Sequence, residues 1–117
     1  MRRVIIYSGS AEFRALIEAL LADESLVITK STSRKELFEL CSNDHFDFVL
    51  TDDFRMFMGD ERATKRIRQA DRSPEIIVFS YDTSEESVVA LLEMGVNQFI
   101  TLPLAPKRLR RKILGHK

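Results

Sequence analysis

The chain has 117 residues, of which 44% are hydrophobic and 31% charged, and this balance predicts one globular domain over residues 1–117 with a core large enough to fold alone. Lysine plus arginine and aspartate plus glutamate number 18 each, which argues against a general attraction to nucleic acid or to a membrane surface. A single cysteine, Cys41, excludes an internal disulfide, and no apolar run is long enough to cross a membrane, so we expect a cytoplasmic protein.

Short apolar runs alternate with stretches of helical periodicity along the chain. The short runs predict strands at residues 3–7, 26–29, 48–51, 76–80 and 98–101. Helices are predicted at about residues 11–23, 34–43, 60–70, 85–94 and 106–114, with capping boxes at residues 33–36 and 83–86, a left-handed Gly95 after the fourth helix, and residues 54–59 as a loop. This alternation predicts an α/β domain in which helices cover both faces of a five-stranded, doubly wound parallel sheet.

Two aspartates follow the third predicted strand, an apolar run that ends at Thr51. Asp52 and Asp53 stand where the strand leaves the sheet, because a strand buried on both faces can carry charge only at its ends. Ligands of open α/β sheets bind at this carboxyl edge, so Asp52 is the centre of the candidate site. The alternative is structural, since an aspartate here can also cap nearby backbone amides.

The order of these motifs resembles the receiver domain of bacterial two-component response regulators over essentially the whole chain. The matching pieces are the strand ending in Asp52, Ile67-Arg68, Pro74 before the fourth strand, Gly95, Phe99 and Pro103. The resemblance implies the flavodoxin-like (βα)5 receiver fold with strand order 2-1-3-4-5, and a role in signalling rather than enzymatic activity. It also implies that Asp52 is the phospho-acceptor, that the Ser80 hydroxyl hydrogen-bonds the phosphoryl group, and that Phe99 is an aromatic switch.

The chain departs from this family where the family supplies positive charge. The family has two acidic residues after the first strand that hold Mg²⁺, and Ser8 and Gly9 stand there instead. It has a lysine before the proline that follows the fifth strand, and Leu102 stands there. Phosphoryl transfer depends mainly on such cations. We therefore expect a lost magnesium site, no cofactor, and no efficient metal-assisted phosphorylation of Asp52.

Two groups near the strand ends have alternative interpretations. Arg55 lies three residues beyond Asp52, so it either pairs with the Asp52 carboxylate or remains a solvated loop arginine. Asp53 is the second carboxylate at this position. Ser8-Gly9-Ser10 is either a plain N-cap turn or a place where backbone amides hold an anion or a cofactor phosphate.

The last predicted helix carries a basic surface without acidic residues, made of Lys107, Arg108, Arg110, Arg111, Lys112 and Lys117. In the family that this chain resembles, the fourth helix, fifth strand and fifth helix form the output face. The corresponding residues here are Val88, Leu91, Leu92, Phe99, Leu109, Arg108 and Arg111. Some of the apolar members must belong to the core, so we expect only part of this set to contact a partner. The expected partners are signalling proteins, such as a histidine kinase or an effector, or a second copy of the chain through this face. Nucleic acid is not expected, because the helix is short and lacks interleaved aromatic residues.

We therefore predict an atypical receiver that works as a protein-interaction module in two-component or phosphorelay signalling. One alternative is a phospho-accepting receiver that uses Asp52, and a second is an anion or cofactor binder that uses Ser8 to Ser10. The histidines, His45 and His116, provide neither a catalytic triad nor a zinc site.

Overall fold

The computed structural model describes residues 2–68, 74–82 and 84–115. Its five parallel strands form one sheet in the order β2-β1-β3-β4-β5, which confirms the predicted topology. The strands are β1 (Arg2–Tyr7), β2 (Leu26–Ser31), β3 (Phe48–Thr51), β4 (Glu75–Ser80) and β5 (Gln98–Thr101). The helices are α1 (Ala11–Leu20), α2 (Arg34–Asn43), α3 (Phe54–Gly59), α4 (Ala63–Ile67), α5 (Glu85–Glu93) and α6 (Pro106–Leu114).

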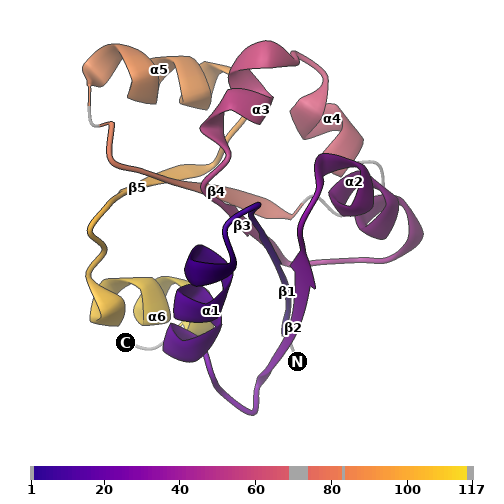
Figure 1. The fold of residues 1–117 in the computed structure, drawn as a ribbon, viewed down its shortest axis with the longest axis vertical. Helices are drawn as coiled ribbons and strands as arrows, with labels where there is room; N and C mark the ends of the chain where they lie inside the picture. The colour runs from indigo at the N-terminus through magenta and orange to yellow at the C-terminus, as the bar shows by residue number, and fades with distance from the viewer. Residues whose placement is uncertain (1, 69–73, 83, 116–117) are drawn as a thin grey trace.

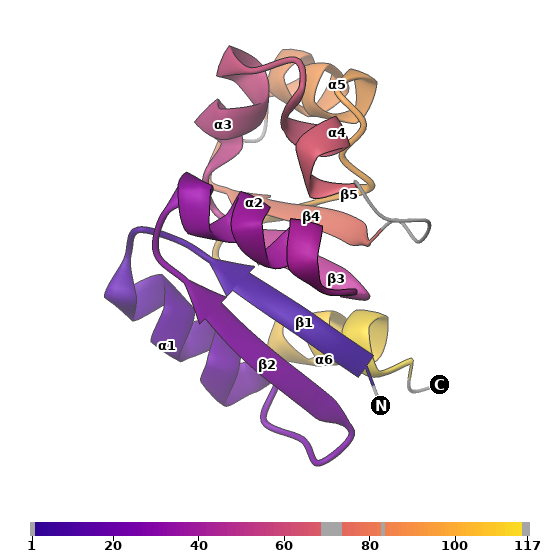
Figure 2. The same ribbon diagram turned by 90° about the vertical axis from the view of Figure 1, so that its right-hand side faces the viewer.

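Helices cover both faces of the sheet, as Figures 1 and 2 show. Helices α1 and α6 cover one face, and α2, α3, α4 and α5 cover the other. Alternate strand residues point to opposite faces, so the central strands contribute to two apolar cores. The first includes Ile5, Val49, Val78, Leu37, Phe57 and Leu91, and the second includes Ile6, Leu50, Phe79, Phe13, Ile17 and Ile113.

Serine side chains fix the starts of three helices. The hydroxyls of Ser10, Ser33 and Ser84 accept hydrogen bonds from the backbone amide of the third residue of α1, α2 and α5 respectively. The Glu36 carboxylate accepts from the Thr32 amide, so the first predicted capping box is formed with a small shift. The second predicted capping box begins at Thr83, which lies outside the described residues, whereas the N-cap in the structure is Ser84.

The segment after β3 differs from the prediction. Residues 54–59 form helix α3 rather than a loop, because the Asp53 side chain caps its first turn and Met56 and Phe57 are buried. The next helix begins at Ala63 rather than at residue 60, since the Asp60 carboxylate accepts from the Arg62 amide in a preceding turn. The predicted end of that helix, at residue 70, lies outside the described residues.

The other predicted helix ends agree more closely with the structure. Helix α6 has the predicted bounds, and Gly95 has the predicted left-handed backbone, with φ of +97°. Helix α1 stops at Leu20 rather than at residue 23, where the Asp23 carboxylate instead accepts from the Ser25 amide in the turn before β2. None of the helices in the described part of the chain is long and apolar enough to span a membrane.

Candidate functional site

The carboxyl edge of the sheet brings three of the predicted site residues into one pocket. A cavity of about 270 Å³ is lined by Asp52, Phe54, Phe79, Ser80, Tyr81, Asp82 and Leu102. Strands β3 and β4 are neighbours in the sheet, which places Asp52 and Ser80 side by side at their ends. Leu102 joins them because its amide donates to the Ser80 carbonyl at 2.9 Å.

The pocket has acidic and apolar walls. It contains the carboxylates of Asp52 and Asp82, and none of its described lining residues is a lysine, arginine or histidine. Asp82 accepts hydrogen bonds from the Ser84 amide (2.9 Å) and the Ser87 hydroxyl (2.8 Å), which lower the pKa of its carboxyl. Within the described part of the chain, the half-buried Asp52 side chain forms no hydrogen bond or ion pair. The local charge is therefore negative.

Ser8, next to Asp52 at the end of β1, is fully buried and already hydrogen-bonded. Its hydroxyl accepts from the Ser10 amide at 2.9 Å, its amide donates to the Ser31 carbonyl at 3.1 Å, and its carbonyl accepts from Arg14 at 2.6 Å. Ser10 is the N-cap of α1, so the N-cap turn is formed, and the anion-binding alternative stays a prediction. At the exposed Gly9, an added Cβ would meet no atom within 4 Å.

The second aspartate, Asp53, is the centre of a hydrogen-bonded cluster. Its carboxylate accepts from the Tyr7 hydroxyl at 2.7 Å and from Arg34 through Nε at 2.8 Å and Nη2 at 3.1 Å. Burial alone would raise the pKa of Asp53, but the bonds from Arg34 and Tyr7 outweigh it and lower the pKa. Burial and the neighbouring carboxylate raise the pKa of Tyr7 to about 12. This cluster ties together the ends of β2, β1 and β3.

The predicted pairing alternative for Arg55 is wrong in this structure. No hydrogen bond or ion pair joins Arg55 to Asp52 among the described residues, and its guanidinium lies 6.0 Å from the centre of the Phe54 ring. The pair that forms at this edge is Asp53 with Arg34. Arg34 and Tyr7 were missed, although one signal was present: Tyr7 ends β1, and Arg34 begins α2 just beyond β2, so both lie at the edge that Asp53 occupies.

The predicted output face separates into buried and exposed residues. Leu91 and Leu109 are each 1% exposed and belong to the cores, so their assignment to a docking surface was wrong. Leu92 is 47% exposed, Arg108 and Arg111 are exposed, and Val88 is partly buried. Phe99 is half-buried and, with Pro103 and Arg108, lines a separate pocket of about 250 Å³ between β5 and α6.

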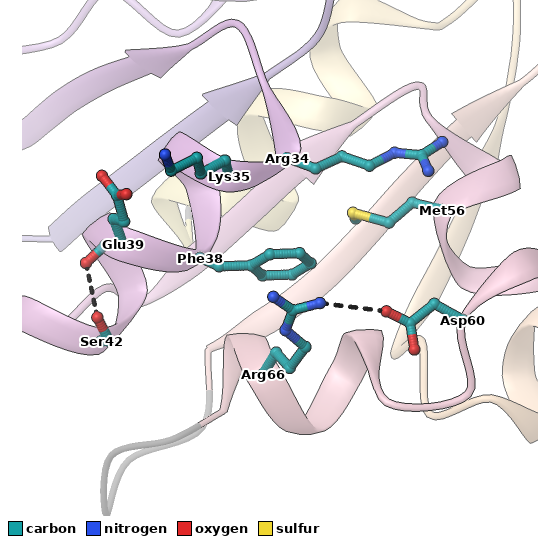
Figure 3. A pocket seen from close by; sticks show the side chains of 8 residues that line it. All are labelled: Arg34, Lys35, Phe38, Glu39, Ser42, Met56, Asp60 and Arg66. Atoms are coloured by element: carbon teal, nitrogen blue, oxygen red, sulfur yellow. Dashed lines mark hydrogen bonds and ion pairs between the residues drawn. The ribbon is translucent and has the colours of Figure 1, made fainter.

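A wider groove of about 540 Å³ lies between α2 and the α3–α4 segment, and it was not predicted from the sequence. Figure 3 shows the Phe38 ring in its middle, with the Arg66 guanidinium beside the ring. Arg66 lies 4.1 Å from the ring centre and 3.5 Å from the Asp60 carboxylate. The groove shares no residue with the Asp52 pocket and is lined by both charge signs.

Comparison with known proteins gives a family and a set of structural relatives. The family model of the response regulator receiver domain matches residues 4–114. A structure described as that of an atypical orphan response regulator with a phosphorylation-independent regulatory mechanism has a TM-score of 0.78 and 21% identity over 97% of this chain and 92% of that chain.

Two further relatives have the same fold. A CheY-like receiver domain protein from Methanospirillum hungatei JF-1 gives a TM-score of 0.77 and 20% identity over 98% of this chain and 92% of that chain. A putative pilus assembly protein (cpaE) from Burkholderia thailandensis E264 gives a TM-score of 0.79 and 17% identity over 98% of this chain and 97% of that chain. No curated protein sequence matches this chain.

Proposed function

This chain belongs to the response regulator receiver domain family of two-component signalling, and we propose that it acts there as a protein-interaction module without magnesium-dependent phosphorylation of Asp52. Receiver domains are in general non-enzymatic modules that interact with signalling proteins such as histidine kinases and effectors. The single observation that carries the proposal is the lining of the Asp52 pocket. Its described residues include two carboxylates and no lysine, arginine or histidine.

The residues around Asp52 lack the acidic pair that the family places after the first strand to hold Mg²⁺. Proteins bind this ion through carboxylate oxygens together with phosphate and water oxygens. At the end of β1 the chain offers the Ser8 hydroxyl, which is buried and hydrogen-bonded, and the side-chain-free Gly9. The Asp53 carboxylate is held by Tyr7 and Arg34. In the described residues, no three His, Cys, Asp or Glu side chains come together as a metal-binding group.

The missing charges set the size of the expected effect. Phosphoryl transfer gathers negative charge on the transferred oxygens, and it is stabilised by fixed cations. One unit charge at about 4 Å contributes on the order of 4 kcal/mol at an effective dielectric near 20. Losing one such charge therefore corresponds to roughly a thousandfold in rate. A pocket that already holds Asp82 beside Asp52 adds repulsion to this deficit.

The test is to incubate the protein with Mg²⁺ and acetyl phosphate, or with beryllofluoride, and to follow intact mass and the amide shifts near Ser80 and Phe99. We expect no covalent adduct and no shift. A matched gain-of-function variant is Gly9→Asp with Leu102→Lys, since the exposed Gly9 position has room for a side chain. We expect this double variant to gain both signals. A wild-type acyl phosphate formed as fast as in the variant would refute the proposal and favour the phospho-accepting alternative.

We propose that the face made of α5, β5 and α6 binds a second copy of the chain, because the charges of its two helices are opposite in sign. Helices α5 and α6 lie on opposite sides of β5 (Figure 1). Helix α5 carries Glu85, Glu86 and Glu93 without a basic residue, and α6 carries basic residues without an acidic one. Two copies related by a two-fold axis beside β5 would place each acidic helix against a basic one. Exposed Val89 and Leu92 supply apolar area between these charges.

Light scattering over a concentration series tests this pairing. We expect a dimer that weakens with salt and with Arg111→Glu, because both changes reduce the attraction between α6 and the partner's α5. The control is Arg62→Glu, an exposed arginine in the turn before α4. A monomer at every concentration, or equal weakening by both variants, would contradict the pairing.

A further inference from the structure

We propose that the Asp52 pocket binds the arginine side chain of a partner protein. The inference rests on the proposed function and deepens it, because it names the chemistry by which a partner would be recognised at the edge of the sheet where the family carries out its phosphoryl chemistry.

The first argument is charge. Asp52 and Asp82 both line the pocket, and among its described lining residues neither carboxylate meets a lysine, arginine or histidine. The Asp82 carboxylate accepts hydrogen bonds from Ser84 and Ser87, whereas the Asp52 carboxylate accepts none from the described residues. A cation that enters this pocket gains two attractive partners, and an anion meets two repulsive ones.

The second argument is the nature of the walls. Phe54 and Tyr81 provide aromatic rings, and Leu102 provides an aliphatic side. Tyr81 is 76% exposed, so much of its surface is accessible to a ligand next to the carboxylates. Guanidinium groups stack on aromatic faces while they donate a planar pair of bonds to a carboxylate, so this combination suits arginine.

The third argument is size. A volume of about 270 Å³ is slightly below the usual range for small-molecule sites, so the cavity suits one side chain rather than a nucleotide or cofactor. The chain's own Arg55 does not supply the cation, because it lies over the Phe54 ring and forms no bond with Asp52 among the described residues. The carboxylate is thus left to an arginine from outside.

The experiment titrates the isotopically labelled full chain with N-acetyl-arginine N-methylamide and follows the amide shifts of residues 80–82. The matched control ligand is the citrulline analogue, which has nearly the same shape without charge. We expect saturable shifts with arginine, and an affinity at least about tenfold weaker with citrulline. Equal binding of the two ligands, or no saturable shift with arginine, would overturn the inference.

Two variants separate the pocket from the overall acidity of the protein. Asp52→Asn removes the charge at a position without described hydrogen bonds, and we expect it to weaken arginine binding about tenfold. Glu61→Gln removes an exposed charge in the turn before α4, and we expect no change. Equal losses in both variants would refute a specific site. The titration contains no phosphate or Mg²⁺, so its outcome is independent of the acetyl phosphate experiment, and either proposal can fail alone.

Discussion

Replacing Asp53 by asparagine tests whether its carboxylate, rather than that of Asp52, holds the edge of the sheet together. The Asp53 side chain is 19% exposed and accepts three hydrogen bonds from Tyr7 and Arg34. Hydrogen bonds to charged groups contribute about 1.5–3 kcal/mol to stability. The Arg34 side chain is 52% exposed, so we expect its bonds to contribute at the lower end of that range. We therefore expect Asp53→Asn to lower the free energy of unfolding by about 2 kcal/mol.

Urea denaturation followed by circular dichroism measures this change. With a slope of about 1–3 kcal/mol/M, the unfolding midpoint should fall by roughly 1 M. The control is Asp52→Asn at the adjacent position, which should change stability by less than about 0.5 kcal/mol because it has no described hydrogen bond to lose. Equal effects of the two substitutions, or a neutral Asp53→Asn, would refute the reasoning.

The acid dependence of the same pair gives a further check. The folded-state pKa of Asp53 lies below the ordinary value of 3.8, so the charged carboxylate stabilises the fold at neutral pH. That contribution fades as the pH falls through 3.8 toward the folded value, because the proton then binds in both states. The stability difference between wild type and Asp53→Asn should therefore shrink in this window, and a constant difference would contradict the assignment.

Three further predictions concern single side chains. Burial raises the pKa of the Cys41 thiol to about 11, so a disulfide reagent at neutral pH should label it only on unfolding, and rapid native labelling would contradict this. Gly95→Ala should cost about 1 kcal/mol or more in urea denaturation, since φ is +97° and its Cβ would lie 3.3 Å from Thr64; a neutral result would contradict that geometry. Phe79→Ala should cost about 3–5 kcal/mol, whereas Leu92→Ala at an exposed position should cost far less, and a reversed order would refute the burial pattern.

The fold was predictable because its signals are local and repeated. Each strand contains a short apolar run, and the two cores use alternate residues of the same strands. Residues 54–59 were the exception, since six residues are too few to show helical periodicity and a cap from Asp53 decides the outcome. Leu91 and Leu109 were misplaced for a related reason, because an apolar side chain on an amphipathic helix can be assigned to core or surface only when its neighbours are known.

The candidate site was predictable in part. Asp52, Ser80 and Leu102 could be placed together because the carboxyl ends of neighbouring parallel strands meet at one edge. Strand order also places Tyr7 and Arg34 at this edge, but it does not decide which of the two carboxylates they bond. The side-chain direction that sends Asp53 toward Tyr7, and leaves Asp52 in the pocket, depends on the turn into α3.

The contrast between the two adjacent aspartates has a consequence for comparing this chain with its relatives. One acid is anchored and the other is available, although they are neighbours and chemically identical. An alignment that slips by one position here would therefore match the family's phospho-acceptor position to the anchored carboxylate of Asp53, and only the partners of each side chain reveal the error.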